Sequence, residues 1–433
     1  MTQGCFLVAA MVGAVAMIAA ATATAAPMKS SAPHQPGTAT QPGATQAAPE
    51  RLALRIATFN IEDVRTDDLL DPGQPRVRAI AQIIQRLRPN IILLNEIAYD
   101  MPGAPGVADG AEPGQNAQRF VDNFLARPQV EGVEPIRYRV YMAPTNTGMP
   151  SGFDLDNDGQ TITAFPTPPG AHADGTPGDQ TEGGRLYGND CWGFGTFPGQ
   201  YAMALLVDER LEILRGEART FRLLPWDYMP NNRMPADPAT GEAWYDEAEA
   251  RVVRLSSKSH WDVPVRLPNG AVLHVLCSHP TPPAFDGPER RNVRRNHDEV
   301  RFWADYVEDA SYVVDDAGRA GGLPGRTNFV ILGDQNLDPD DPHDIGNAMR
   351  DIVLASPRVN AAFTPRSDVP IARERGEIDP TDTAFWGKRA DYVIPSATLD
   401  VIGGGIWRHT PTGAARFPSD HFPVWLDVGV GRP

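Results

Sequence analysis

The feature that most constrains the fold is a recurring pattern in which a short apolar segment ends in polar residues. Its clearest copy is Asn328–Pro339 (NFVILGDQNLDP), where β-forming residues stop at Gly333 and are followed by Asp334 and Asn336. A continuous apolar run of this length predicts a strand buried on both faces. If the backbone stays extended, Asp334 and Asn336 point to the same side. The alternative is an ordinary turn, because Gly, Asp and Asn are also common turn residues.

The same pattern recurs along the chain and brings further polar residues with it. The copies are Ile56–Asn60 (IATFN), Asn90–Glu96 (NIILLNE), Leu273–His279 (LHVLCSH), Arg389–Ile394 (RADYVI) with Asp391, and Ser419–His421 before the apolar run Phe422–Val428. Each polar residue taken singly has an ordinary structural explanation, such as a strand-end hydrogen bond. Their number, order and spacing together indicate a functional site.

In this order, the motifs TFNI, NE, SH, GDQN, ADYVI and SDHFPV resemble the endonuclease/exonuclease/phosphatase superfamily. Its members are metal-dependent phosphoesterases that include DNase I-like nucleases, sphingomyelinases and inositol-phosphate phosphatases. The resemblance extends from about Leu52 to Val430. It implies an α/β (α+β) fold, a DNase I-like four-layer sandwich of two packed mixed β-sheets flanked by helices. It also implies hydrolysis of phosphodiester or phosphomonoester bonds by in-line attack of water activated by a metal and an Asp.

The resemblance also implies a role for individual residues. Glu96 would be the principal ligand of a divalent cation, with Asn60 and Asp420 assisting, because carboxylate and amide oxygens suit Mg²⁺, Mn²⁺ or Ca²⁺. The expected catalytic residues are His279, Asp334, Asn336, Asp391 and His421.

Within that group, Asp334 would orient or deprotonate the attacking water, and Asn336 would hold the phosphate. His421 would contact a phosphoryl oxygen or transfer a proton, with Asp391 fixing its tautomer. His279 would donate to the phosphate or the leaving group from the opposite side. Outside the motifs, Lys258 and Arg294 are candidates for binding a substrate phosphate.

Periodicity predicts a β-α-β start followed by mostly β structure. The expected helices are Pro75–Leu87, Gln115–Ala126 and about Glu289–Val313. The expected strands are Leu52–Ile61, Asn90–Asn95, Arg137–Tyr141, Tyr201–Val207, Arg251–Leu255, Trp261–Leu267 and Ala271–Cys277, then the GDQN strand and three more.

The N-terminal residues predict export. Phe6–Ala21 is apolar but short for a membrane span, and Ala23–Ala25 is a small-residue cleavage pattern, so residues 1–25 are typical of a signal peptide. An uncleaved anchor is the alternative, because no Lys or Arg precedes the apolar run. Residues 26–50 lack large apolar side chains and predict a flexible linker. One domain at 51–433, secreted or periplasmic and without a stable membrane span, is therefore expected.

A long irregular insert, about residues 101–199, contains Asp154, Asp156 and Asp158 followed by Gly159. Alternating carboxylates before a glycine match the first half of a calcium loop. The twelfth position is Phe165, which excludes an EF-hand. We expect a structural Ca²⁺ site completed by a later carboxylate; the alternative is a solvated Asp-rich turn.

Charge and cysteine content limit the partners and the compartment. The formal net charge is −16, from 55 acidic and 39 basic residues, so the long-range field opposes a polyanion. Only Cys191 and Cys277 would remain after signal removal, which excludes a disulfide framework; we expect a buried thiol at Cys277, with one bridge as the alternative.

Several function classes stay open. The leading one is a secreted, monomeric phosphoesterase whose substrate is a nucleic acid, a phospholipid head group, an inositol phosphate or a nucleotide. The alternatives are a nuclease acting on DNA or RNA, and a non-catalytic, calcium-stabilised binding protein on the same fold. The latter would be expected to have lost at least one of the site residues, and all of them are present.

Overall fold

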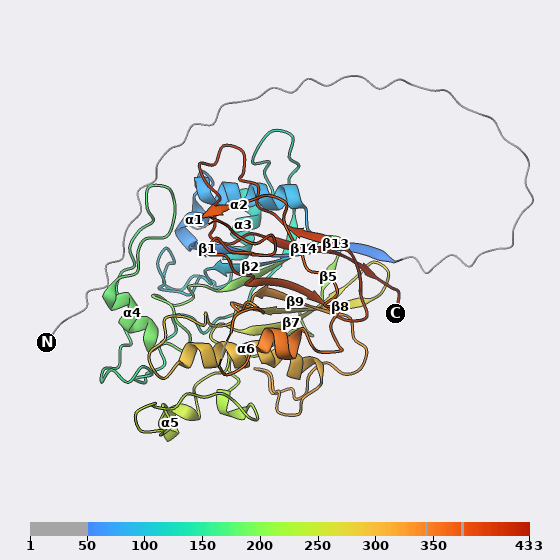
Figure 1. Ribbon diagram of the computed structural model, residues 1–433. Helices are drawn as coiled ribbons and strands as arrows, with labels where there is room; N and C mark the ends of the chain where they lie inside the picture. Colours follow the sequence, from blue (N-terminus) through green and yellow to red (C-terminus); the bar gives the residue numbers. More distant parts are fainter. Residues whose placement is uncertain (1–50, 343, 374–375) are drawn as a thin grey trace, which may run out of the picture. The chain divides into compact units, whose positions relative to one another are not determined.

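The computed structural model describes residues 51–342, 344–373 and 376–433. The predicted signal peptide and linker lie outside these residues. Within them, two mixed β-sheets pack face to face, with α2 on the outer face of one sheet and α6 on the outer face of the other (Figure 1). The predicted four-layer fold is confirmed.

The first sheet has the strand order β13-β14-β1-β2-β4-β3, in which β1 and β2 are parallel and the other neighbours are antiparallel. Its strands are β1 (Leu52–Val64), β2 (Ile91–Ile97), β3 (Tyr138–Tyr141), β4 (Met203–Asp208), β13 (Asp400–Ile406) and β14 (Val424–Val430). Helix α2 (Pro75–Leu87) connects β1 to β2, as predicted. Pro75 starts it in a favourable first-turn position, and the Gln74 side chain caps it by accepting from the backbone of Arg76 and Val77.

The second sheet has the order β12-β9-β8-β7-β5, with β6 also paired to β7, and here β8 and β9 are parallel. Its strands are β5 (Glu212–Ile213), β6 (Arg219–Thr220), β7 (His260–Arg266), β8 (Val272–Ser278), β9 (Phe329–Asp334) and β12 (Asp391–Pro395). The long helix α6 (Arg291–Val307) covers this sheet. The smaller elements are α1 (Thr66–Leu70), α3 (Asn116–Phe120), η1 (Val121–Leu125), α4 (Glu182–Asn189), η2 (Trp226–Tyr228), α5 (Glu247–Ala250), η3 (Met349–Val353) and the hairpin β10 (Ala372–Arg373) to β11 (Gly376–Glu377).

Strand β9 shows why its sequence is apolar throughout. Val330 and Leu332 face the core shared with the first sheet, whereas Phe329 and Ile331 face a separate core that α6 closes. Both faces are therefore buried. The polar residues begin only where the strand ends.

Two predicted elements differ from the structure. The predicted strand Arg251–Leu255 is wrong, because the backbone N–H groups of Val252 and Val253 bond back to the carbonyl of Glu249 and continue the turn of α5. The helix expected to reach Val313 stops at Val307, and Asp309 then adopts φ +58°, which ends the helical run.

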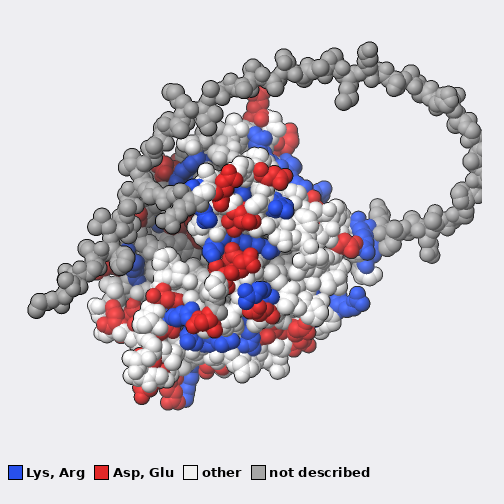
Figure 2. All heavy atoms as spheres, viewed as in Figure 1, with Lys and Arg blue, Asp and Glu red and all other residues white. Residues whose placement is uncertain are grey.

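Three further properties concern the surface and the cysteines. Acidic and basic side chains are interspersed on the face shown in Figure 2. Among the described residues, no helix is both long enough and apolar enough to cross a membrane. Cys191 and Cys277 are buried free thiols, so the predicted thiol at Cys277 is confirmed.

Candidate active site

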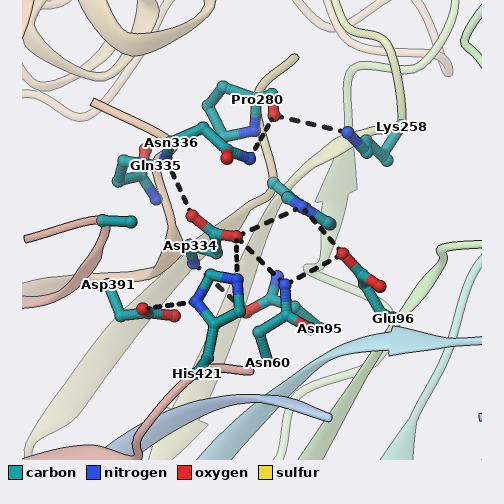
Figure 3. Close-up of polar contacts among 12 residues, drawn as sticks. Asn60, Asn95, Glu96, Lys258, Pro280, Asp334, Gln335, Asn336, Asp391 and His421 are labelled. Carbon is teal, nitrogen blue, oxygen red and sulfur yellow. Dashed lines mark hydrogen bonds and ion pairs between the residues drawn. The ribbon is translucent and has the colours of Figure 1, made fainter. Parts of the chain in front are cut away.

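The polar ends of β1, β2, β8, β9 and β12 meet at one end of the two sheets (Figure 3). The pairs β1–β2 and β8–β9 are parallel, so the residues that end them lie at a common edge. Antiparallel pairing places Asp391, the first residue of β12, opposite Asp334, the last residue of β9. Strand ends distant in sequence thus place the predicted side chains together.

Asp334 lies at the centre of this group and is almost fully buried. Its Oδ2 accepts a hydrogen bond from Asn60 Nδ2 at 3.0 Å and lies 3.5 Å from Nε2 of both His279 and His421. Its Oδ1 accepts from the backbone N–H of Asn336 at 2.8 Å. Burial raises the pKa of Asp334 to about 6, although the charge of His421 opposes the rise. The carboxylate is thus ionised at neutral pH and basic enough to take a proton.

Glu96 lies beside Asp334 and shares a hydrogen-bond donor with it. Asn60 Nδ2 donates to Glu96 Oε1 at 3.0 Å, and the backbone N–H of Asp63 donates to Oε2 at 3.1 Å. Glu96 has φ +66°, a left-handed conformation that is uncommon outside glycine and that concentrates at functional sites. Burial, and then the charge of Asp420, raise the pKa of Glu96 to about 7.

His421 is held by Asp391, as predicted from the motifs. Its Nδ1 lies 2.8 Å from Asp391 Oδ2, which also accepts a hydrogen bond from the Thr383 hydroxyl at 2.7 Å. Burial disfavours the charged ring, but Asp391 and Asp334 outweigh it and raise the pKa of His421 well above its ordinary value. The ring is therefore an imidazolium at neutral pH, with Nε2 on the side of Asp334.

The pKa of His279 is shifted in the opposite direction to that of His421. Burial, with the charges of Lys258 and His421, lowers the pKa of His279 well below its ordinary value, so its ring is neutral. Its Nε2 lies 3.9 Å from Glu96 Oε1, between the two carboxylates. One neutral and one charged imidazole thus flank Asp334.

Asn336 corrects one expectation from the sequence. Its backbone has φ +52°, so the strand does not continue and the side chain does not run parallel to that of Asp334. Instead Asn336 Nδ2 donates to the carbonyl of Pro280 at 3.1 Å, the same oxygen that accepts from Lys258 Nζ at 3.3 Å. The predicted Lys258 therefore lies in the site, next to Asn336 (Figure 3).

The donor set at Glu96 suits a hard cation. Glu96, Asp420 and Glu62 place carboxylates close enough to influence one another, since burial and Asp420 also raise the pKa of Glu62 to about 7. A divalent cation would relieve this repulsion, and oxygen ligands favour Mg²⁺, Mn²⁺ or Ca²⁺. Asn60, predicted as a ligand, presents its amide nitrogen to the carboxylates and accepts from Glu62 N through Oδ1. Here it positions Glu96 and Asp334.

A second set of ligand atoms, from Asp334, Asp391 and His421, lies within 4.8 Å of one another. These three groups already contact one another, because His421 Nδ1 is hydrogen-bonded to Asp391 and Nε2 faces the carboxylate of Asp334. This arrangement is typical of a proton-transfer group, and the metal ligands are better sought at Glu96.

The carboxylates that lie close together at the predicted calcium loop are not the three that the sequence predicted. Asp154, Asp156 and Asp190 bring carboxylate oxygens within 4.8 Å of one another, and Asp158 is not among them. Both oxygens of Asp154 accept backbone N–H groups, from Asp158 and Gly159, which shapes the turn. Asp190 is the later carboxylate in this group, and its two oxygens accept the backbone N–H groups of Leu155 and Ile162. Calcium binding here stays a prediction.

Several residues of the site escaped sequence reasoning. Asn95 Oδ1 accepts the backbone N–H of Asp334, and Ser419 Oγ donates to the carbonyl of Asn60 while accepting from His421 N. Both lie next to predicted residues and could have been found there. Glu62 lies two residues after Asn60 and could also have been found there. Thr383 lies in a segment without a strand-end pattern, and only the folded chain brings it to the site.

A cavity of about 660 Å³ opens beside these residues. Glu96, Lys258, His279 and Asp420 line it together with residues of the 101–199 insert and of α6. Arg294, predicted to bind phosphate, is not among the lining residues, whereas its neighbours Arg291 and Arg295 are. The role of Arg294 stays a prediction without a supporting contact.

Comparison with known proteins agrees with this geometry. A sequence model of the Endonuclease/Exonuclease/phosphatase family matches residues 57–421. No curated protein matches the chain in sequence.

Similar folds occur among solved structures. An endonuclease/exonuclease/phosphatase from Beutenbergia cavernae DSM 12333 is 18% identical, with 88% of this chain and 72% of that chain covered and a TM-score of 0.48. The human Nocturnin catalytic domain with bound sulfate anion is 14% identical (88% and 96% covered, TM-score 0.43). D. rerio TDP2 complexed with single strand DNA product is 10% identical (87% and 98% covered, TM-score 0.44). At these identities the likeness concerns the fold alone.

Proposed function

Because the chain belongs to the endonuclease/exonuclease/phosphatase family, we propose that it is a secreted, metal-dependent phosphoesterase that hydrolyses phosphodiester or phosphomonoester bonds. One observation carries the proposal. Asp334 Oδ2 lies 3.5 Å from Nε2 of both His279 and His421, and Asn60 links the same oxygen to Glu96. A general base, one neutral and one positively charged imidazole, and a carboxylate suited to a metal therefore lie within one small region.

Glu96 and Asp420 would hold the metal, and Asn60, which the sequence predicted as a further ligand, would hold Glu96 in place through its amide nitrogen. When bound, a divalent cation neutralises phosphate charge and lowers the pKa of a coordinated water. Asp420 is suited to this role because its side chain is 48% exposed and so can reach a cation at the mouth of the site.

The chain's own residues account for the deprotonation of water and for the hydrogen bonds to the phosphate. Asp334, with a pKa of about 6, accepts the proton of the attacking water. The imidazolium of His421 donates through Nε2 to a phosphoryl oxygen, while Asp391 fixes its Nδ1. Asn336 and Lys258 supply N–H donors to the phosphate. Neutral His279 donates a hydrogen bond, but no proton, to the leaving-group oxygen, which takes its proton from solvent. These preorganised donors stabilise the charge that develops on phosphorus oxygens.

The nuclease alternative receives no support from the charge distribution, because the net charge of −16 repels a polyanion. The non-catalytic alternative would leave the buried group at Asp334 without a function, although burying it costs stability.

The variant Asp334→Asn tests the proposal, because it removes the base and keeps the shape. We expect a loss of at least about a hundredfold in kcat/KM for an aryl phosphate ester, the usual scale for general bases. Asp298→Asn is the matched control, since Asp298 is a fully buried carboxylate outside the site that accepts from Trp226 Nε1. It should lower the melting temperature yet leave the turnover of the folded protein intact. Equal turnover in Asp334→Asn and the wild type would refute the role of Asp334.

A further inference from the structure

The 101–199 insert supplies part of the wall of the cavity of about 660 Å³ beside the site. This wall runs from Glu96 and Lys258 to Trp192 of the insert and to Arg291 and Arg295 of α6. The insert is fastened at this wall, since Asn146 N bonds the carbonyl of Lys258. A concave pocket of this size fits a small molecule.

Two cations in the cavity wall lack a carboxylate partner. Lys258 is 5% exposed, and Nζ donates to the carbonyl of Pro280. The guanidinium of Arg295 donates to the carbonyls of Leu255, Trp192 and Arg254 at 3.1, 2.6 and 2.7 Å. In the part of the chain that the structure describes, neither cation has a carboxylate within ion-pair distance.

Glu299 is the main neighbouring carboxylate of both cations. Burial lowers the pKa of Lys258 and of Arg295, and the charge of Glu299 opposes that shift. The oxygens of Glu299 accept hydrogen bonds from the backbone N–H groups of Ser257 and Thr281, both at 2.6 Å, so one carboxylate without a direct ion pair is shared by two cations. Arg291, also in the wall, has Nε 4.0 Å from Glu289 Oε1 and donates through Nη1 to the carbonyl of Leu155. Burying cations without a direct ion pair is costly, so such a wall favours an anionic ligand.

The insert adds a cation and an aromatic ring to the same wall. Arg185 lines the cavity and donates to the carbonyl of Gln180, close to the acidic Glu182. Trp192 of the insert lines the cavity too, as does Tyr245 outside the insert, and both rings provide flat apolar surface. Apart from Glu96 and Asp420, the charged residues of the lining are three Arg, one Lys and one Glu.

We propose, on the basis of the phosphoesterase function above, that the substrate is a compact ester carrying a second anionic group, a carboxylate or a phosphate. The scissile phosphate lies at Asp334 and Lys258. The second anion enters the insert cavity and contacts Arg291 and Arg295, whose guanidinium charge attracts an oxyanion at short range. Nε and Nη2 of Arg295 already donate to carbonyls, which leaves Nη1 for the ligand.

Isothermal titration calorimetry with two matched ligands tests the inference without requiring turnover. Glycerol 3-phosphate and 3-phosphoglycerate have the same carbon chain and phosphate and differ in one carboxylate. In buffer with Mg²⁺, the full-length mature protein should bind 3-phosphoglycerate about tenfold more tightly or better, the scale of one hydrogen bond to a charged group. Bulk electrostatics predict the reverse, because the protein itself is negatively charged.

Variants on α6 test whether the preference for 3-phosphoglycerate comes from the cavity arginines. Arg291→Gln, and Arg295→Lys in case loss of the Arg295 hydrogen bonds hinders folding, should lower the affinity ratio of the two ligands toward one. Arg301→Gln is the control, because Arg301 lies on the same helix, donates to the carbonyls of Asn231 and Pro230, and does not line the cavity. It should keep the wild-type ratio.

The outcomes separate this inference from the proposed function. Equal affinities in the wild type, or the same ratio in Arg291→Gln and Arg301→Gln, would overturn the second-anion site even if aryl phosphates are hydrolysed. A ratio that falls only in the cavity variants, together with no hydrolysis of any phosphate ester, would retain the anion site and refute the phosphoesterase.

Discussion

Asp334, Glu96 and His421 show how burial sets the chemistry of single residues. Desolvation raises the pKa of Asp334 to about 6 and that of Glu96 to about 7, while two carboxylates overcome desolvation at His421 and keep it charged. The same low-dielectric surroundings therefore make Asp334 a base, Glu96 a carboxylate suited to bind a cation, and His421 an imidazolium.

Glu96→Gln should abolish metal-dependent turnover while leaving the fold nearly intact. Glutamine keeps the volume and the oxygen that accepts from Asn60 Nδ2, but it removes the charge that attracts the cation. The measurement is kcat/KM against metal concentration, with a thermal melt for stability. An unchanged rate at saturating metal would remove Glu96 from the site.

His421 and Asp391 should act as one unit, because Asp391 exerts its effect through His421 Nδ1. We expect His421→Ala and Asp391→Asn each to lose on the order of a hundredfold in rate. The double variant should be little worse than His421→Ala alone. Kinetics of the three variants that gave the product of the two single losses would show that Asp391 is not the partner of His421.

The pair also makes a pH prediction. Asp391 raises the pKa of His421, so Asp391→Asn lowers it, and the imidazolium is lost at a lower pH. The alkaline fall of kcat/KM should shift to lower pH in this variant, and the optimum should fall with it. A pH profile identical to that of the wild type would contradict the assignment.

At the scale of elements, the parts that the sequence predicted are those with a local burial pattern. Helix α2 and strand β9 carry continuous periodic or apolar signals, and both occur where expected. The bend at Asn336 and the contact of Thr383 with Asp391 were not predicted, because a left-handed residue and a loop contact leave no periodic trace. Within the insert, a helix at Gln115–Ala126, a strand at Arg137–Tyr141 and an Asp-rich loop were predicted, but the contacts that place the insert beside the site were not.

Gly193→Ala tests how the insert is fastened to the site. A Cβ at Gly193 would lie 1.7 Å from the carbonyl oxygen of Ser257, so the loop or the segment before β7 must shift. We expect a loss of about 1–3 kcal/mol in unfolding free energy, the usual cost of overpacking. Gly216→Ala is the control, because nothing lies within 4 Å of its Cβ position. Equal denaturant midpoints for both variants would contradict close packing at Gly193.

At the scale of the whole molecule, a protein of negative net charge places several cations in one cavity wall. The net charge of −16 coexists with Lys258, Arg291 and Arg295 in a single cavity wall. A metal and these cations can bind a compact anion despite the repulsive long-range field, because contacts at short range in a partly desolvated pocket are screened less.

We predict that the protein is exported and that its signal peptide, residues 1–25, is cleaved after Ala25. The protein recovered from the periplasm or the culture medium should then begin near Ala26. Intact-mass spectrometry measures this directly. A mass equal to that of the full 433-residue chain in either fraction would contradict it.

The central claim is that this family member hydrolyses phosphate esters with a metal held at Glu96 beside Asp334. The most direct measurement is release of nitrophenol from bis(4-nitrophenyl) phosphate and from 4-nitrophenyl phosphate by metal-depleted protein, before and after addition of Mg²⁺ or Mn²⁺. We predict that at least one ester is hydrolysed, that chelator abolishes the reaction, and that added metal restores it. Hydrolysis of neither ester, or an equal rate with and without chelator, would contradict the account.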